Sequence, residues 1–277
     1  MSVVLGYFGS TGRVLTSVVE RWSLLTALAK RDLSDEYVDH TFSMIWGYIM
    51  PLFTMVIYLV VFNVIWPTRV QAPEGHATDA TIYLLAGILP WLTLNQALGR
   101  SLTSVTNNSN IVKQMAFPLE LLPLKSLMTP AMFMLVSIAF LFIYAGWVTH
   151  GSILPVYIVG VPVLLAITLV MYAGLALLFS TMQVFLRDTK EFVTMFLQVG
   201  LFLHPILYLP DSIPHAVRGL IYASPFTYLI FCWQDILFYG EIHRPLAWIV
   251  VVVLSAVLFT IGSRLFMGTK PYFGDFL

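Results

Sequence analysis

The acidic side chains of this sequence gather in one short stretch, at residues 32–39, which holds four of the chain's carboxylates. Asp35 and Asp39 lie four positions apart, so on a helix they would share one face and could hold a divalent cation. Two basic residues directly precede the stretch, and this mixture of charges is more typical of a solvated connector. We therefore expect no metal site here.

The other residue types that serve as ligands, nucleophiles or general bases are scattered. The four loop histidines are far apart and lack ligand spacing; they are His76, His150, His215 and His243. A lone cysteine, Cys232, excludes an intrachain disulfide and a multi-cysteine zinc site. We expect no catalytic residue, which makes an intramembrane glycosyl- or acyl-transferase the weakest of the functions considered.

A nucleotide site is also not expected. A phosphate-binding loop requires glycines followed by Lys and Ser or Thr, so that backbone amides can surround the phosphates. The glycine-rich stretch 6–12 has no lysine after it. The chain is thus not predicted to hydrolyse ATP, and any ATP and magnesium would be bound by a separate partner chain, leaving this one without a cofactor.

Composition indicates a membrane protein. Of the 277 residues, 59% are hydrophobic and 10% are charged, whereas soluble domains carry about 25% charged residues. The mean hydropathy is +0.87, and the uncharged apolar runs match the ~20 residues that cross a bilayer. The formal net charge is +0, so no basic surface favours a nucleic-acid partner.

The apolar runs predict an all-α polytopic protein, a single transmembrane domain over residues 1–277 with six transmembrane helices. Residues 41–66 carry no charge, and neither does the run between Lys125 and Arg187, which is long enough for two spans with a break near 149–152. The predicted spans are 41–66, 80–100, 126–147, 153–182, 191–209 and 245–267.

Three further segments flank these spans. Residues 1–40 are predicted to form an amphipathic helix in the membrane interface, with a helix docked on a partner or on the chain's own spans as the alternative. Residues 101–125 are polar and compatible with helix. Residues 210–240 are rich in proline and aromatics, which favours a re-entrant pair of short helices.

The distribution of Lys and Arg predicts which side each loop occupies, because basic residues collect on the cytoplasmic side. With six spans and the N-terminus inside, only Arg69, Arg218 and Arg244 fall outside. Both termini and residues 101–125 are therefore expected in the cytoplasm, and residues 210–240 outside.

Apart from Arg100, Glu191 and Arg264 close to span ends, the predicted spans contain aromatics but no Asp, Glu, Lys, Arg or His other than His204. Ion-coupled carriers place charged groups in mid-membrane, so an external energy source is expected. Sugar rings can stack on aromatic faces without any charge, which suggests a conduit for a glycan; ordinary core packing is the alternative. The candidate conduit residues are Tyr58, Phe62, Phe196, Phe202 and Tyr208.

Short blocks along nearly the whole chain resemble the membrane subunit of type-2 ABC exporters of bacterial cell-envelope polysaccharides, such as O-antigen and teichoic acid. The blocks are 30–33 with Tyr37, Trp46, Pro51 and Phe62; Gly87–Trp91; Asn107–Pro123, with Asn110–Lys113 and Phe117–Pro123; Arg187–Asp188; Pro205–Tyr208 with Ile213–Pro214; and Ser224–Tyr228. Three blocks depart from the family pattern: the usual Leu-Gly before Trp46 is missing, His204 replaces a serine and Ser224 replaces an asparagine.

This resemblance implies a permease in the bacterial cytoplasmic membrane that pairs with a second copy and with two ATPase subunits. It also implies that residues 107–123 contact the ATPase. The coupling candidates are Asn107, Asn110, Lys113, Phe117, Pro118 and Glu120.

The substrate implied by the resemblance is a polysaccharide on undecaprenyl diphosphate, moved outward through a lateral opening between spans one and five. Candidate contacts of the diphosphate are Arg13, Arg21, Lys30, Arg31 and Arg100, for which ordinary positive-inside anchoring is the alternative. Export of a drug or a lipid by the same fold is the nearest alternative function.

Overall fold

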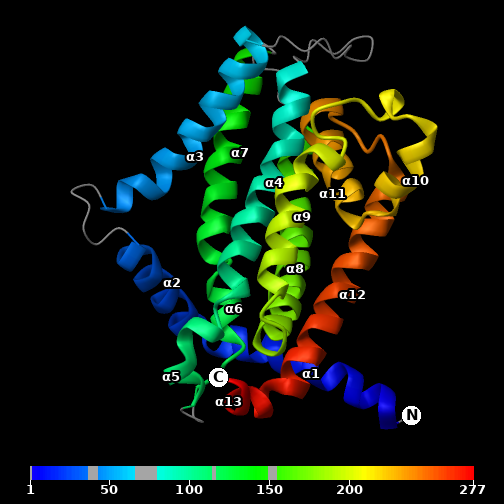
Figure 1. Cartoon of the computed structure of the whole chain (residues 1–277). Helices are drawn as coiled ribbons and strands as arrows, with labels where there is room; N and C mark the ends of the chain where they lie inside the picture. The colour runs from blue at the N-terminus through cyan, green and yellow to red at the C-terminus, as the bar shows by residue number, and fades with distance from the viewer. Residues whose placement is uncertain (1, 37–42, 66–79, 114–116, 149–154) are drawn as a thin grey trace.

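The computed structural model describes residues 2–36, 43–65, 80–113, 117–148 and 155–277, and it is helical throughout with no strand in those ranges (Figure 1). The long helices run alongside one another as a bundle, and both chain ends lie at the same end of it. The all-α prediction is confirmed.

Within the described residues, four helices are long and apolar enough to cross a membrane. They are α4 (Ala80–Leu102), α7 (Met128–Val148), α8 (Pro155–Phe185) and α12 (Pro245–Thr269). Helix α4 is central, because it packs against α7, α8, α9 and α11 and 78% of its apolar window is buried. The other three present more of their apolar surface outward.

Two glycines bring α8 and α12 into close contact. A Cβ atom on Gly262 would lie 2.2 Å from the carbonyl oxygen of Gly174, and one on Gly174 would lie 2.4 Å from the backbone nitrogen of Phe259. Since real Cβ atoms do not approach backbone this closely, the crossing requires glycine at both positions. This close packing gives the bundle its most extensive helix pair.

The other two predicted spans, 41–66 and 191–209, are not among these four helices. Helix α3 (Ser43–Val60) continues as a π-helical turn, η1 (Val61–Ile65), and its described apolar part is Ile49–Ile65. Helix α9 (Thr189–Leu203) has 15 residues; at 1.5 Å per residue it covers about 22 Å of a bilayer core of about 30 Å. Four spans are therefore supported, and the count of six stays a prediction.

The N-terminal segment forms two helices, where the sequence predicts one. Helix α1 (Ser2–Glu20) lies across the end of the bundle and α2 (Trp22–Glu36) turns toward α3, with the bend at Arg21 (Figure 1). Val14 of α1 and Leu25 of α2 are buried, with α1 packed on α12 and α2 packed on α6 and α7. Leu15, Val19 and Trp22 are exposed, so the placement of this segment in the membrane interface stays a prediction.

The segment before α12 contains the expected pair of short helices. They are α10 (His215–Ala223) and α11 (Pro225–Gln234), preceded by η3 (Pro210–Ser212) and followed by a π-helical turn, η4 (Asp235–Tyr239). Helix α11 is buried against α4 and α12, whereas α10 is largely exposed. Gly240 ends η4 in the left-handed conformation, with φ 67°. Whether the pair is re-entrant stays a prediction.

Short helical turns fill the opposite end. After α4 come η2 (Thr106–Asn108), α5 (Ser109–Val112) and α6 (Leu121–Lys125), and after α12 come η5 (Lys270–Tyr272) and α13 (Phe273–Phe276). Together with α1 and the end of α8, these turns form what we term the α1 end of the bundle (Figure 1).

Candidate functional site at the α1 end of the bundle

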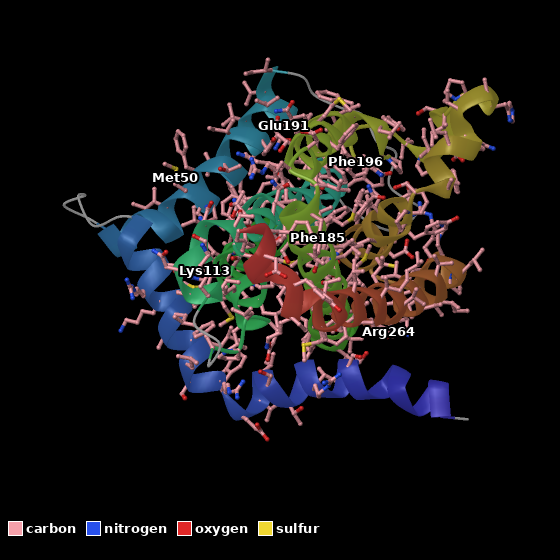
Figure 2. All side chains as sticks on the ribbon, turned by 60° about the horizontal axis from the view of Figure 1, so that its bottom comes forward. Met50, Lys113, Phe185, Glu191, Phe196 and Arg264 are labelled. Atoms are coloured by element: carbon pink, nitrogen blue, oxygen red, sulfur yellow. The ribbon has the colours of Figure 1, made fainter. Side chains whose placement is uncertain are left out.

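Segments distant in the sequence meet at the α1 end. The ring of Phe185, at the end of α8, lies 6.0 Å from that of Phe273 and 4.8 Å from that of Phe276, measured between centroids. Figure 2, which brings this end forward, shows α13 between Lys113 and Phe185. The C-terminal turns are thus packed between α8 and the segment that follows α4.

A buried carboxylate joins three of these segments. The Glu120 side chain, in a residue that is 3% exposed, accepts hydrogen bonds from Ser17 Oγ (2.6 Å) and Lys270 Nζ (2.7 Å). Arg21 Nη1 lies 3.9 Å from the same carboxylate. Burial alone would raise the pKa of Glu120, but the hydrogen bonds from Lys270 and Ser17 outweigh it and hold that pKa below its ordinary value. The carboxylate is therefore ionised at neutral pH.

Beside Glu120 lies a hollow of about 620 Å³, which we term the tail hollow. Its charged rim is Arg13, Lys113, Lys270 and Asp275, and its apolar lining includes Phe117 and Met267. Each wall comes from a different part of the chain: α1, residues 112–113 with 117 and 119, and the end of α12 with η5 and α13. The sequence alone gave no sign that the C-terminal residues lie here.

The six predicted coupling residues divide into two groups. Asn107, Asn110 and Lys113 are exposed at the surface of the α1 end. Phe117 is half-buried in the tail hollow, while Pro118 and Glu120 are buried. The first group is placed to contact a partner, and the second holds the segment against the rest of the protein.

The five predicted diphosphate contacts are not gathered in one site. Arg13 borders the tail hollow, Arg21 lies beside Glu120, and Lys30 and Arg31 are exposed on α2. Arg100 lines a separate polar cavity of about 440 Å³, which we term the Arg100 cavity.

The Arg100 cavity also contains Asp32 and Lys125, and Lys125 Nζ donates a hydrogen bond of 2.8 Å to Asp32 Oδ1. The first carboxylate of the acidic stretch is thus paired with a lysine from α6. Asp39 and its neighbours from 37 onward lie outside the described residues. Among the described ones, no group of three His, Cys, Asp or Glu side chains is arranged to hold a metal.

The predicted conduit aromatics occupy two separate helices. Tyr58 and Phe62 stack along α3 and η1, with ring centroids 6.1 Å apart. Phe196 and Phe202 project from α9 and are 37% and 67% exposed. Both helices contact α4, and most residues of α9 are exposed, so α9 lies on the outside of the bundle.

The fifth conduit candidate, Tyr208, has a local role. Its hydroxyl donates a hydrogen bond of 2.8 Å to the carbonyl oxygen of Leu203, at the end of α9. The five candidates therefore lie on two separate helices and in the turn after α9, and their role in a conduit stays a prediction.

A sequence profile of the ABC-2 type transporter family matches residues 23–238. The chain belongs to this family. It is 28% identical over 261 residues to an O-antigen export system permease protein, RfbA, of Klebsiella pneumoniae, covering 92% of this chain and 95% of the relative. A protein of the same name from Myxococcus xanthus is 21% identical over 269 residues, covering 95% and 98% of the two chains.

Family membership together with the apolar helices identifies this chain as an integral membrane permease subunit of an ABC transporter. The family implies a partnership with an ATPase chain. The resemblance to this transporter family that the sequence blocks indicate is therefore confirmed.

The histidine predicted within the spans, His204, is a fully buried packing residue of this permease. Its Nδ1 lies 2.6 Å from the carbonyl oxygen of Gly200 and its Nε2 lies 2.7 Å from Ser224 Oγ. The imidazole ring is 4.7 Å from that of Trp91. Because a Cβ atom on Gly200 would lie 2.2 Å from Trp91, glycine is required where α9 passes that indole. His204 thus fixes the end of α9 against α4 and the start of α11.

A second buried carboxylate, Asp235, was missed by the sequence analysis. Its oxygens accept hydrogen bonds from the backbone nitrogen of Arg244 (2.9 Å), from the guanidinium of the same residue (3.2 Å) and from Trp248 Nε1 (3.3 Å). The Arg244 guanidinium also lies 4.3 Å from the centre of the Phe231 ring. The sequence signal for this ion pair was an aspartate nine residues before an arginine. The topology prediction places both residues outside the membrane.

Proposed function

We propose that this ABC-2 permease is the transmembrane subunit of an ATP-driven exporter of a lipid-linked polysaccharide. The substrate is carried on undecaprenyl diphosphate and moves from the cytoplasmic to the outer face of the bacterial cytoplasmic membrane. The observation that carries the proposal is the similarity to O-antigen export permeases, which extends over 92% of the chain. ATP is hydrolysed by a separate partner.

The α1 end is proposed to face the cytoplasm. Basic residues collect there from several parts of the chain, among them Arg13, Lys113 and Lys270, in accord with the positive-inside rule. The exposed residues of the segment after α4 would then meet the ATPase.

Single cysteines test this topology cleanly, because the native Cys232 is fully buried. An impermeant thiol reagent added outside intact cells should label Ser212→Cys, on exposed η3, and should not label Asn110→Cys, on exposed α5. Breaking the cells should make Asn110→Cys reactive. Labelling of Asn110→Cys from outside would reverse the proposed orientation.

The conduit is proposed to form between two copies of the permease, each with its own ATPase subunit. Helices α3 and α9 both carry exposed apolar side chains, including Phe53, Phe192 and Phe202. Pairing of two copies would bring the aromatics of α3 and α9 from opposite chains together. Aromatic faces then offer many weak stacking contacts to successive sugars.

The lipid headgroup is proposed to enter near the Arg100 cavity. Arg100 and Lys125 both line it, and guanidinium and ammonium groups are the usual partners of phosphate oxygens. The cavity also adjoins α2, which leads toward α3 and the proposed lateral opening.

Deletion of the permease gene tests the substrate. Cells without it should lose surface polysaccharide and accumulate the lipid-linked polymer inside, and the wild-type gene should restore export. Normal surface polysaccharide in the deletion strain would contradict the proposal and favour export of a drug or a lipid.

The conduit is tested by alanine at Tyr58, Phe62 and Phe202 together. Export should fall while yield and assembly with the ATPase stay normal, because these side chains are at most half-buried. The matched control replaces three exposed apolar residues of α12 with alanine, namely Leu246, Ile249 and Val253. Normal export by the aromatic triple variant would place the conduit elsewhere.

A further inference from the structure

We propose that the tail hollow is a docking cup of the permease for its ATPase, and that its occupant is an ATPase segment carrying an apolar side chain flanked by carboxylates. The C-terminal turns η5 and α13 would thus be part of the interface, together with α1 and the segment after α4. This inference rests on the proposed function and specifies where the partner binds.

Hydrogen bonds and aromatic contacts hold the walls of the tail hollow in place. Lys270 lines it and donates a hydrogen bond of 2.7 Å to Glu120, whose other oxygen accepts one of 2.6 Å from Ser17. On the far side, Phe273 and Phe276 pack against Phe185 of α8. All three walls are therefore tied to the bundle, and a partner would meet a preformed concave surface.

Charge indicates what the hollow would bind. Lys270 is neutralised by Glu120, which leaves Arg13 and Lys113 as cations and Asp275 as the one acidic group on the rim. Within the described residues, neither Arg13 nor Lys113 has a carboxylate partner. A positive rim around an apolar lining complements an apolar anchor with acidic neighbours.

The hollow also adjoins the surface already proposed to contact the ATPase. Lys113 belongs to both, since it borders the hollow and directly follows α5, on which Asn110 is exposed. A partner that contacts Asn110 and Lys113 would therefore reach the edge of the hollow.

Filling the hollow is the sharpest test. Gly274 lines it, and a Cβ atom there would meet nothing within 4 Å, so Gly274→Trp adds an indole without a clash at its base. The matched control is Gly268→Trp on α12, where a Cβ atom also meets open space outside the hollow lining. Both variants should be purified and titrated with the ATPase.

Gly274→Trp should weaken ATPase binding by at least about tenfold, the effect of blocking an interface anchor, with unchanged permease yield and thermal stability. Gly268→Trp should bind as wild type does. Normal binding by Gly274→Trp would overturn the inference. So would a loss of export by Gly274→Trp with ATPase binding intact, because the hollow would then serve something else.

Charge reversal gives an independent measurement. Arg13→Glu and Lys113→Glu should slow ATPase association, with the largest effect at low salt. Lys190→Glu, an exposed residue of α9 outside the hollow lining, is the control. An equal effect of Lys190→Glu would overturn the inference in favour of diffuse attraction to a basic surface.

Failure of the inference and failure of the proposed function are distinguishable. If wild-type permease binds the ATPase and Gly274→Trp binds it equally well, only the docking cup is wrong. If the wild-type permease does not bind the ATPase, the proposed function itself is wrong.

Discussion

Among the residues that the structure describes, this permease has two buried carboxylates, at opposite ends of the bundle and held by different kinds of partner. Asp235 is bound by Arg244 and Trp248, which are 9 and 13 residues away in the sequence. Glu120 is bound by Ser17 and Lys270, which are 103 and 150 residues away. The first closes a local turn, whereas the second joins the beginning, the middle and the end of the chain.

This difference indicates what each carboxylate can transmit. Because its partners are close in the sequence, Asp235 stabilises only the turn that leads into α12. A junction of three distant segments passes a displacement of one segment to the other two, because its hydrogen bonds are short and lie in a buried site. Glu120 is therefore suited to coupling, and Asp235 to stability.

The largest expected effect is on stability, from Asp235→Ala. Removing the carboxylate leaves the Arg244 guanidinium, whose side chain is 22% exposed, without its partner; breaking such a buried pair costs about 3–5 kcal/mol. Thermal unfolding in detergent should show a clearly lowered midpoint. Glu241→Ala, at an exposed acid nearby, is the control. Equal unfolding midpoints for the two variants would contradict a stabilising role for the Asp235–Arg244 pair.

Glu120→Gln should cost less stability but impair coupling. Loss of the charge weakens the short hydrogen bonds from Ser17 and Lys270. The free energy of unfolding should fall by about 1–3 kcal/mol. ATP hydrolysis by the assembled transporter should continue while export falls.

The double variant Glu120→Gln with Lys270→Met separates the two roles of Glu120. Removing both partners of a buried pair recovers much of the stability lost with one, but it does not restore the link between the segments. Stability should therefore return without export. Recovery of export in the double variant would show that Glu120 acts through stability alone.

The pH dependence follows from the lowered pKa of Glu120. Since the folded-state pKa lies below the ordinary value of 4.5, the carboxylate contributes stability that is fully present above that value. The contribution is lost as pH falls through the folded-state pKa. The difference in unfolding midpoint between wild type and Glu120→Gln should be constant above about pH 5.5 and shrink below it. A difference that grows toward acid pH would contradict the hydrogen-bonding arrangement.

The smallest effect is expected from Asp32→Ala. The Lys125 side chain is only 9% exposed, but the Asp32 side chain is 38% exposed and both line the polar Arg100 cavity, where water can reach the ammonium group left behind. Ion pairs open to water contribute about 1 kcal/mol or less. The midpoint of unfolding should shift only slightly. A shift as large as that of Asp235→Ala would mean that this pair is a third structural junction.

The sequence alone determined the long apolar helices closely. The predicted spans 126–147, 153–182 and 245–267 correspond to α7, α8 and α12 with small shifts at their ends. Long uncharged runs leave the backbone no other way to satisfy its hydrogen bonds in a membrane, so their composition suffices. Family membership could also be predicted from the sequence, because the blocks that carry the resemblance are short continuous segments.

Tertiary structure decided the rest. Pro205 ends helix α9 locally, because it favours the extended backbone that His204 adopts. The contacts of the His204 side chain with Gly200, Ser224 and Trp91 were decided by the tertiary structure, and the hydropathy of residues 191–209 does not reveal them. The single N-terminal helix became two because α1 and α2 bury their apolar sides against different neighbours.

Glu120 is the sharpest example. Its place in a polar segment predicts contact with a partner, yet the structure turns its carboxylate inward, where Ser17 and Lys270 meet it. Local sequence predicts where a chain is polar or apolar. Which distant groups share a buried site depends on how the helices pack, and only the folded bundle brings those groups within hydrogen-bonding distance.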